Sequence, residues 1–284
     1  MSLRTGGATK TDARPADRDA PLRVLLTNDD GITSPGLAAL ARAVSRVAAT
    51  VVVAPEHERS AASHAITLHK PLRAARTALP GMDVPAWATN GTPADCVVLG
   101  LLALLPEPPD VVVSGINAGA NLGMDLLYSG TVSAAVEAAL FGIAAIAMSV
   151  AAFRDIHWEP AAEFAARLVR QVASHALPAD TFLNVNLPNR PAAGIGGVEI
   201  TRQSARRYVS RIEKRSDPRG RDYYWLTGSI DSEEGPAGTD VWAVAQGRIS
   251  VTPLRLDMTN DSLQPALRSW ALTAPRGRWA YTVA

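Results

Sequence analysis

Two adjacent aspartates, Asp29 and Asp30, follow directly on an apolar run in the sequence RVLLTNDDGI. Neighbouring carboxylates disfavour each other's ionised form unless a positive charge lies between them. Carboxylate oxygens are preferred ligands of Mg²⁺ and Mn²⁺, which keep other positions open for phosphate oxygens. The pair therefore indicates a cation site, although Asn-Asp-Asp-Gly is equally typical of a turn with local backbone bonds.

A second polar loop, PEHERSAASH, carries Ser60, His57 and His64. A serine hydroxyl can bind a hard cation or a phosphate, but most loop serines hydrogen-bond to nearby backbone. Either histidine could move a proton near neutral pH, although histidines are more often surface or packed residues. The spacings H-E-x-x-H and C-x-x-C are absent from the sequence, which argues against a common zinc site.

A third loop, SGINAGANLGMDLLYSGTVSAA, combines four glycines with Asn117 and Asn121. Glycines let the backbone approach a ligand, and Ser129, Gly130 and Thr131 open an expected helix whose free N–H groups could bind phosphate. The alternative is that the glycines form turns and that Ser129 or Thr131 caps the helix. The motifs of P-loop NTPases, Rossmann dinucleotide sites and α/β-hydrolases are absent, which disfavours those three classes.

Alternating strands and helices are expected to position these loops. Short β-branched runs predict buried strands at RVLLT, TVVVAP, PDVVVSG, GIAAIAMSV and TFLNVNLP, with alanine- and leucine-rich stretches of helical spacing between most of them. This alternation predicts a three-layer, Rossmann-like α/β fold with a mostly parallel sheet and helices on both faces. Ligands bind beyond the carboxyl ends of such strands, so we expect the three loops to converge at one edge.

The C-terminal third of the chain has a different texture. Residues 190–240 are rich in glycine, arginine, serine and aromatic residues, and RDYYWLTGSI alternates in a way that predicts a β-hairpin or an extended arm. The run GRISVTPLRL predicts one closing strand. We expect a disordered extension over 1–20, one α/β domain over 21–260 with an arm at about 202–235, and a tail over 261–284.

Composition and charge narrow the class of protein. The 284 residues are 47% hydrophobic and 19% charged, as in ordinary globular proteins, and the formal net charge of +1 gives no basic field for nucleic acid as a stable partner. The single cysteine, Cys96, lies in an apolar helical run, which favours a buried structural thiol in a reducing compartment. The chain shows no signal peptide or membrane span, so we expect a cytoplasmic protein.

Several ordered motifs resemble those of the SurE family of survival proteins. They are TNDDGI, VVAPEHERSAASHAITLHKPL, NGTPADCV and PDVVVSGINAGANLGMDLLYSGTVSAA. The segments RRYVSRIEKRSDPRGRDYYWL and GTDVWAVAQGRISVTPLRLDMT are similar to the arm and the closing strand of that family, so the resemblance covers about residues 22–259. Two departures from the family pattern, Ala138 and Ala144, are packing positions away from the expected cation site.

The resemblance implies a metal-dependent phosphatase of the 5′-nucleotidase type. Its substrates would be nucleoside 5′- and 3′-monophosphates, often with an exopolyphosphatase side activity on polyphosphate. The family holds one divalent cation per subunit, Mg²⁺ or Mn²⁺ here, at positions that correspond to Asp29, Asp30, Ser60 and Asn117. Ser60 enters this set through the resemblance alone. The family also forms dimers or tetramers through its arm, which implies a homodimer or homotetramer.

Hydrolysis by a metal-activated water is the expected mechanism, with Asp29 and Asp30 as catalytic residues. Four residues are expected to contact the phosphate: Gly115, Ser129, Gly130 and Thr131. Asp30 could accept the proton from water. A covalent aspartyl-phosphate on Asp29 is disfavoured because the D-x-D spacing expected for that chemistry is absent.

Two other classes of protein stay open from the sequence. A non-catalytic nucleotide sensor would need the helix N-terminus but no cation, and the paired aspartates count against it. An oligomeric scaffold could assemble through the aromatic arm around Tyr223, Tyr224 and Trp225. Assembly would not explain three polar loops at one sheet edge, and it is compatible with catalysis.

Overall fold

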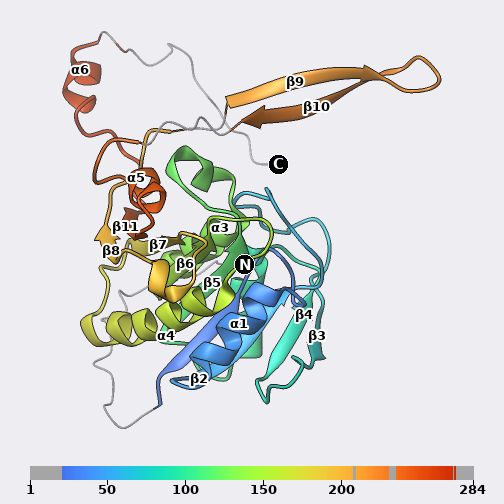
Figure 1. Ribbon diagram of the computed structural model, residues 1–284, viewed down its shortest axis with the longest axis vertical. Coiled ribbons are helices and arrows are strands. Elements are labelled where there is room, and N and C mark those ends of the chain that lie inside the picture. Colours follow the sequence, from blue (N-terminus) through green and yellow to red (C-terminus); the bar gives the residue numbers. More distant parts are fainter. Residues whose placement is uncertain (1–20, 207–208, 230–234, 271, 273–284) are drawn as a thin grey trace, which may run out of the picture.

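A nine-stranded sheet forms the centre of the molecule in the computed structural model, which describes residues 21–206, 209–229, 235–270 and 272 (Figure 1). In spatial order the strands are β3 (Ala74–Thr77), β4 (Ala86–Thr89), β2 (Ala49–Pro55), β1 (Arg23–Thr27), β5 (Val111–Ala118), β6 (Ala144–Val150), β7 (Thr181–Leu187), β11 (Ile249–Arg255) and β8 (Val198–Ile200). All neighbouring pairs from β4 to β7 are parallel, whereas β3 and β11 run antiparallel to β4 and β7.

Helices cover both faces of this sheet. The helices α1 (Pro35–Val44) and α4 (Trp158–His175) pack together on one face, and α2 (Pro93–Leu99) and α3 (Gly130–Leu140) pack together on the other. Each pair closes its own apolar cluster, with Leu37 and Val169 in the first and Val97 and Ala135 in the second. The predicted three-layer fold with a mostly parallel sheet is confirmed.

Burial on both faces explains the continuous apolar runs of the central strands. The first six residues of β5 and the last six of β6 are buried. A parallel sheet between two helical layers favours such β-branched runs over alternating patterns. Cys96 of α2 is buried as expected; burial raises its thiol pKa to about 12, and its sulfur lies 3.2 Å from Thr89 Oγ1.

The C-terminal third contains the predicted hairpin. Strand β9 (Val209–Ser216) pairs antiparallel with β10 (Asp222–Ser229), and the two project away from the sheet in Figure 1. The closing strand is β11. Sequence reading missed the short strands β3, β4 and β8 and the helix α5 (Asp240–Ala245).

The remaining elements are short. Most residues at the two ends of the chain lie outside the described residues. The short elements are η1 (Gly100–Leu104), η2 (Gly123–Tyr128), η3 (Ala192–Gly194) and α6 (Gln264–Ser269). Helix α6 lies in the segment that the sequence suggested as a tail, while the expected extension over 1–20 falls outside the described residues. Among the described residues, none of the helices has the length and apolar character needed to cross a membrane.

Candidate metal and phosphate site

The three polar loops meet at the carboxyl edge of the sheet, because β2, β1 and β5 are neighbours in it. The chain leaves β1 for α1 and β2 on one side, while β5 lies on the other side of β1, so this edge is a topological switch point. Two hydrogen bonds join the loops: Arg59 N donates to Asp29 O at 2.7 Å, and Ala118 N donates to Asp30 Oδ2 at 3.3 Å. The structure thus brings together the segments that the sequence suggested.

Asp29 lies almost fully buried, 4% exposed, against the start of α3. Its Oδ1 accepts a hydrogen bond from the Thr131 hydroxyl. A Cβ atom on Gly130 would lie 2.9 Å from Asp29 Oδ2, so only glycine lets the helix begin this close to the carboxylate. Burial raises the pKa of Asp29, and hydrogen bonds from Thr131 and from backbone N–H groups, including that of Gly130, oppose that rise.

Asp30 is half-buried beside it, and its pKa is raised to about 6. Burial contributes most, the charge of Asp29 adds to it, and Glu58 contributes less, while the N–H of Ala118 acts in the opposite direction. The two carboxylates therefore oppose each other's ionisation. A cation between them would reverse that effect by favouring both ionised forms.

Asn117 and Ser60 differ in whether their oxygen atoms are already engaged in a hydrogen bond. The Asn117 Nδ2 donates to Gly119 O at 2.7 Å, so its Oδ1 is the atom left to face a cation. Asn117 also follows a shift in the β5–β6 register after Ser114. Ser60 is exposed, and its Oγ donates to Glu58 Oε1 at 2.5 Å.

The donor set fits a hard divalent cation. It consists of two carboxylates, an amide oxygen and a hydroxyl, all oxygen donors of the kind that Mg²⁺ and Mn²⁺ prefer. In the described part of the chain, His, Cys, Asp and Glu side chains do not gather in groups of three that could hold a metal. The turn chemistry is present as well, because Asn28 Nδ2 donates to Gly31 O at 2.9 Å.

The residues suggested for phosphate binding have defined structural places. Ser129 is the N-cap of α3 and accepts from Val132 N at 3.1 Å, so the capping alternative holds for it. Gly130 and Thr131 form the first turn beside Asp29. Gly115 instead lies within β5, where a Cβ atom would collide with Met148 O of β6. Close packing of β5 against β6 therefore explains a glycine at position 115.

A buried asparagine network supports the third loop, and sequence reading missed it. Asn186 Oδ1 accepts from Asn121 N at 2.8 Å, and the Nδ2 atoms of Asn184 and Asn186 donate to Asn121 O at 2.9 and 3.0 Å. Asn121 Nδ2 donates to Ser149 Oγ at 2.8 Å. Residues two apart in a strand point to the same side. The two asparagines of TFLNVNLP were therefore a readable signal.

Asp240 gives the same loop a second support. This fully buried residue accepts a hydrogen bond from Gly123 N at 2.8 Å and another from Ser204 N at 2.9 Å. It follows Thr239, the N-cap of α5. The segment that precedes the hairpin and the loop after β5 are thereby tied to one carboxylate.

Comparison with known proteins identifies the family of this chain. A family model described as "Survival protein SurE" matches residues 24–210. A "5'-nucleotidase SurE" of Geobacter sulfurreducens is 52% identical over 256 residues, covering 90% of this chain and 96% of the relative. One of Moorella thermoacetica is 51% identical over 247 residues, covering 87% and 95%. The crystal structure of a SurE protein from Aquifex aeolicus matches with a TM-score of 0.75 and 42% identity, covering 87% and 98%. The resemblance seen in the motifs is confirmed, and the chain belongs to the SurE family.

Proposed function

We propose that this chain hydrolyses nucleoside 5′- and 3′-monophosphates to nucleoside and phosphate, with one Mg²⁺ or Mn²⁺ held by Asp29, Asp30, Asn117 and Ser60. The chain is a phosphoric monoester hydrolase of the 5′-nucleotidase type. Its family supports this class, and so do the names of its relatives, which share about half of its residues. The cation, the 3′-activity and an exopolyphosphatase activity belong to the proposal. The observation that carries it is the contact of buried Asp29 with the first turn of α3.

The α3 N-terminus supplies the binding site for the phosphate. Its first N–H groups donate to the Asp29 carboxylate and stabilise it, and the positive dipole end of the helix favours a phosphate placed beside that carboxylate. A helix dipole fixed in this way needs no rearrangement when charge develops on phosphoryl oxygens. Gly130 matters because it allows the helix to begin at the carboxylate.

The cation, once bound, supplies positive charge for a phosphoryl oxygen and acidifies water. Hydrolysis adds the oxygen of a water molecule to phosphorus and breaks the ester P–O bond, so the nucleoside oxygen leaves with a proton. Asp30 is the proposed acceptor of the proton from the attacking water. Its hydrogen bond from Ala118 N orients the carboxylate on the sheet edge.

The hairpin supports a proposal of self-association. Leu226 is 71%, Ile212 70% and Trp225 55% exposed on two strands that project from the body (Figure 1). An isolated two-stranded hairpin is marginally stable in water, so another copy of the chain would stabilise it. We propose a homodimer or homotetramer, in the cytoplasm as the single buried cysteine suggests. Equal sedimentation of the full chain and of a chain lacking residues 209–229 would contradict this role of the hairpin.

Phosphate release from a panel of nucleoside 5′- and 3′-monophosphates tests the reaction, with Mn²⁺, Mg²⁺ or EDTA present. We expect metal-dependent release that EDTA abolishes and that Asp29→Asn lowers by about a thousandfold or more. Asp83→Asn, at an exposed position, is the matched control and should keep full activity. Release that survives both EDTA and Asp29→Asn would exclude the metal site. Nucleotide binding without release would favour a sensor.

A further inference from the structure

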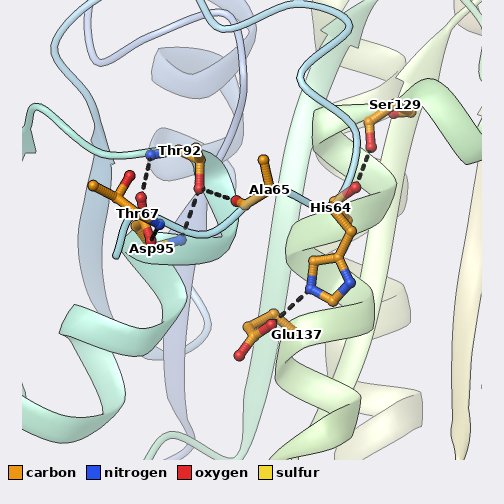
Figure 2. Close-up of polar contacts among 8 residues, drawn as sticks. His64, Ala65, Thr67, Thr92, Asp95, Ser129 and Glu137 are labelled. Atoms are coloured by element: carbon orange, nitrogen blue, oxygen red, sulfur yellow. Dashed lines mark hydrogen bonds and ion pairs between the residues drawn. The ribbon is translucent and has the colours of Figure 1, made fainter. Parts of the chain in front are cut away.

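The loop that carries Ser60 is joined to α3 by a long-range hydrogen bond between side chains. His64 Nε2 lies 2.6 Å from Glu137 Oε2, although the two residues are 73 positions apart (Figure 2). The Glu137 side chain is 12% exposed and that of His64 33%. Removing His64 would leave the largely buried Glu137 side chain without this hydrogen-bond partner, which costs more than the loss of a bond at the surface.

A second set of bonds fixes the following residues to the start of α2. The Thr92 hydroxyl donates to Ala65 O at 2.7 Å, and Asp95 Oδ1 accepts from Thr67 N at 2.9 Å (Figure 2). Thr92 and Asp95 also form the capping box of α2, in which Asp95 N donates to Thr92 Oγ1 and Thr92 N donates to Asp95 Oδ2. Asp95 is 3% exposed. The helix cap therefore binds the loop as well.

Ser63 provides a third attachment, next to the start of α3. Its N donates to Tyr128 O at 3.2 Å, and its Oγ donates to Leu127 O at 2.8 Å. These carbonyls immediately precede Ser129, the N-cap of α3. Residues 63–67 are thus fixed to both helices that cover this face of the sheet.

The other end of the short span around Ser60 is fixed at the carboxylate site, where Arg59 N donates to Asp29 O. Ala61, between these anchors, and Ser63, at the start of the second, have φ angles of 54° and 52°. Residues other than glycine adopt this left-handed conformation at a cost, and it persists where the surroundings fix it. Loss of either anchor would let this span relax and Ser60 move.

We propose that His64 and Glu137 are positioning residues for the reaction. Their pair, with the bonds of Ser63, Ala65 and Thr67, forms a clamp over residues 63–67 that sets where Ser60 and Arg59 lie relative to the carboxylates. This inference rests on the proposed function. It assigns His64 no role in proton transfer, because its ring nitrogen is engaged with Glu137 on the body of α3.

The clamp is tested with His64→Ala, Glu137→Ala, the double variant and Glu137→Gln. Three readouts are compared with the wild type: hydrogen exchange of residues 56–68, binding of Mn²⁺ alone followed by electron paramagnetic resonance, and kcat and KM for a nucleoside 5′-monophosphate. We expect faster exchange in 56–68 but not in α4, weaker Mn²⁺ binding, and kcat/KM lower by roughly tenfold, the scale seen when residues that orient a metal ligand are removed.

The variants should behave as a pair. The double variant is expected to lose little more than either single alanine variant, because the two residues share one interaction. Glu137→Gln keeps a hydrogen-bonding oxygen of the same reach and should recover most of the loss. The matched control is Glu163→Ala, which removes the exposed pair with Arg46 between α4 and the end of α1 and should change none of the readouts.

Two results would overturn the clamp. One is unchanged exchange and unchanged Mn²⁺ binding in His64→Ala. The other is a loss of Mn²⁺ binding and of kcat/KM that only follows global stability, with exchange rising equally in α4. If the wild type releases no phosphate from any nucleotide, the proposed reaction fails, whereas exchange and Mn²⁺ binding still decide whether the clamp positions a cation site.

Discussion

The two sides of the candidate site are built differently. On the side of β1, β5 and α3, Asp29 is buried and bonded to Thr131, and the loop after β5 is held by buried asparagines. On the side of the 56–68 loop, Ser60 is exposed and its hydroxyl donates to the nearby Glu58. The first side is held by buried contacts within the core, and the second by hydrogen bonds at the two ends of an exposed loop. Chemistry that needs fixed charges should therefore depend most on the first side.

Gly130 gives the largest expected effect after removal of Asp29 itself. Gly130→Ala places a Cβ atom 2.8 Å from Asp29 Cβ and 2.9 Å from its Oδ2, so the helix start or the carboxylate must move. Phosphate release should fall by about a hundredfold, and the free energy of unfolding should drop by roughly 1–3 kcal/mol, as for an overpacked core. Nucleotidase assays and urea unfolding measure the two.

The control for this variant is Gly194→Ala, where the added Cβ would meet its nearest atom at an ordinary 3.6 Å. This variant should keep both activity and stability. Full activity in Gly130→Ala would show that the α3 side tolerates movement of the carboxylate, and the contrast between the two sides would then be lost.

The raised pKa of Asp30 predicts that the cation-free protein loses stability as the pH rises. The pKa of this carboxyl rises from 3.8 to about 6 on folding, so the folded state binds more protons than the unfolded state between these values. Stability from this group is complete below about pH 4 and is lost as the pH rises through 6. Asp30→Asn should therefore stabilise the cation-free protein at pH 7 by roughly 1–2 kcal/mol, after discounting for solvent screening.

Melting temperatures of wild type and Asp30→Asn in EDTA from pH 4 to 8 test this sign. The difference between the two should grow as the pH rises, and Mn²⁺ should reverse it by stabilising only the wild type. Asp83→Asn, at an exposed position, should show no such difference. A constant difference across the pH range would mean that Asp30 ionises without a folding cost.

Much of the α3 side was predictable from the sequence because its signals are local. The apolar runs before Asn28 and Ser114 indicated buried strands, and strand order then placed the two loops together. Ser129 as a helix start follows from its type and position. The contact of Thr131 with Asp29 was not predictable, since the residues are 102 positions apart and their distance depends on how α3 packs.

The loop side was less predictable from the sequence because its contacts are long-range. His64 alone is compatible with a proton shuttle, a surface residue or a packed residue, and only the fold brings Glu137 within 2.6 Å of it. The short strands β3 and β4 also escaped the sequence reading, because AART of β3 is wholly exposed and gives no apolar pattern. Pattern reading thus succeeds where burial dictates residue type and fails where long-range polar contacts do.

Ser60 should give the smallest effect of the three sites. To bind a cation its hydroxyl must leave Glu58 Oε1, so part of the ligand's contribution offsets the broken bond. Ser60→Ala is expected to weaken Mn²⁺ binding only a few-fold, on the order of one hydrogen bond's net contribution, and to leave the melting temperature unchanged. Ser45→Ala, at the exposed end of α1, is the matched control. If Ser60→Ala lost as much Mn²⁺ binding as Asp29→Asn, the loop side would be as preformed as the α3 side. The clamp rather than the core would then limit the reaction.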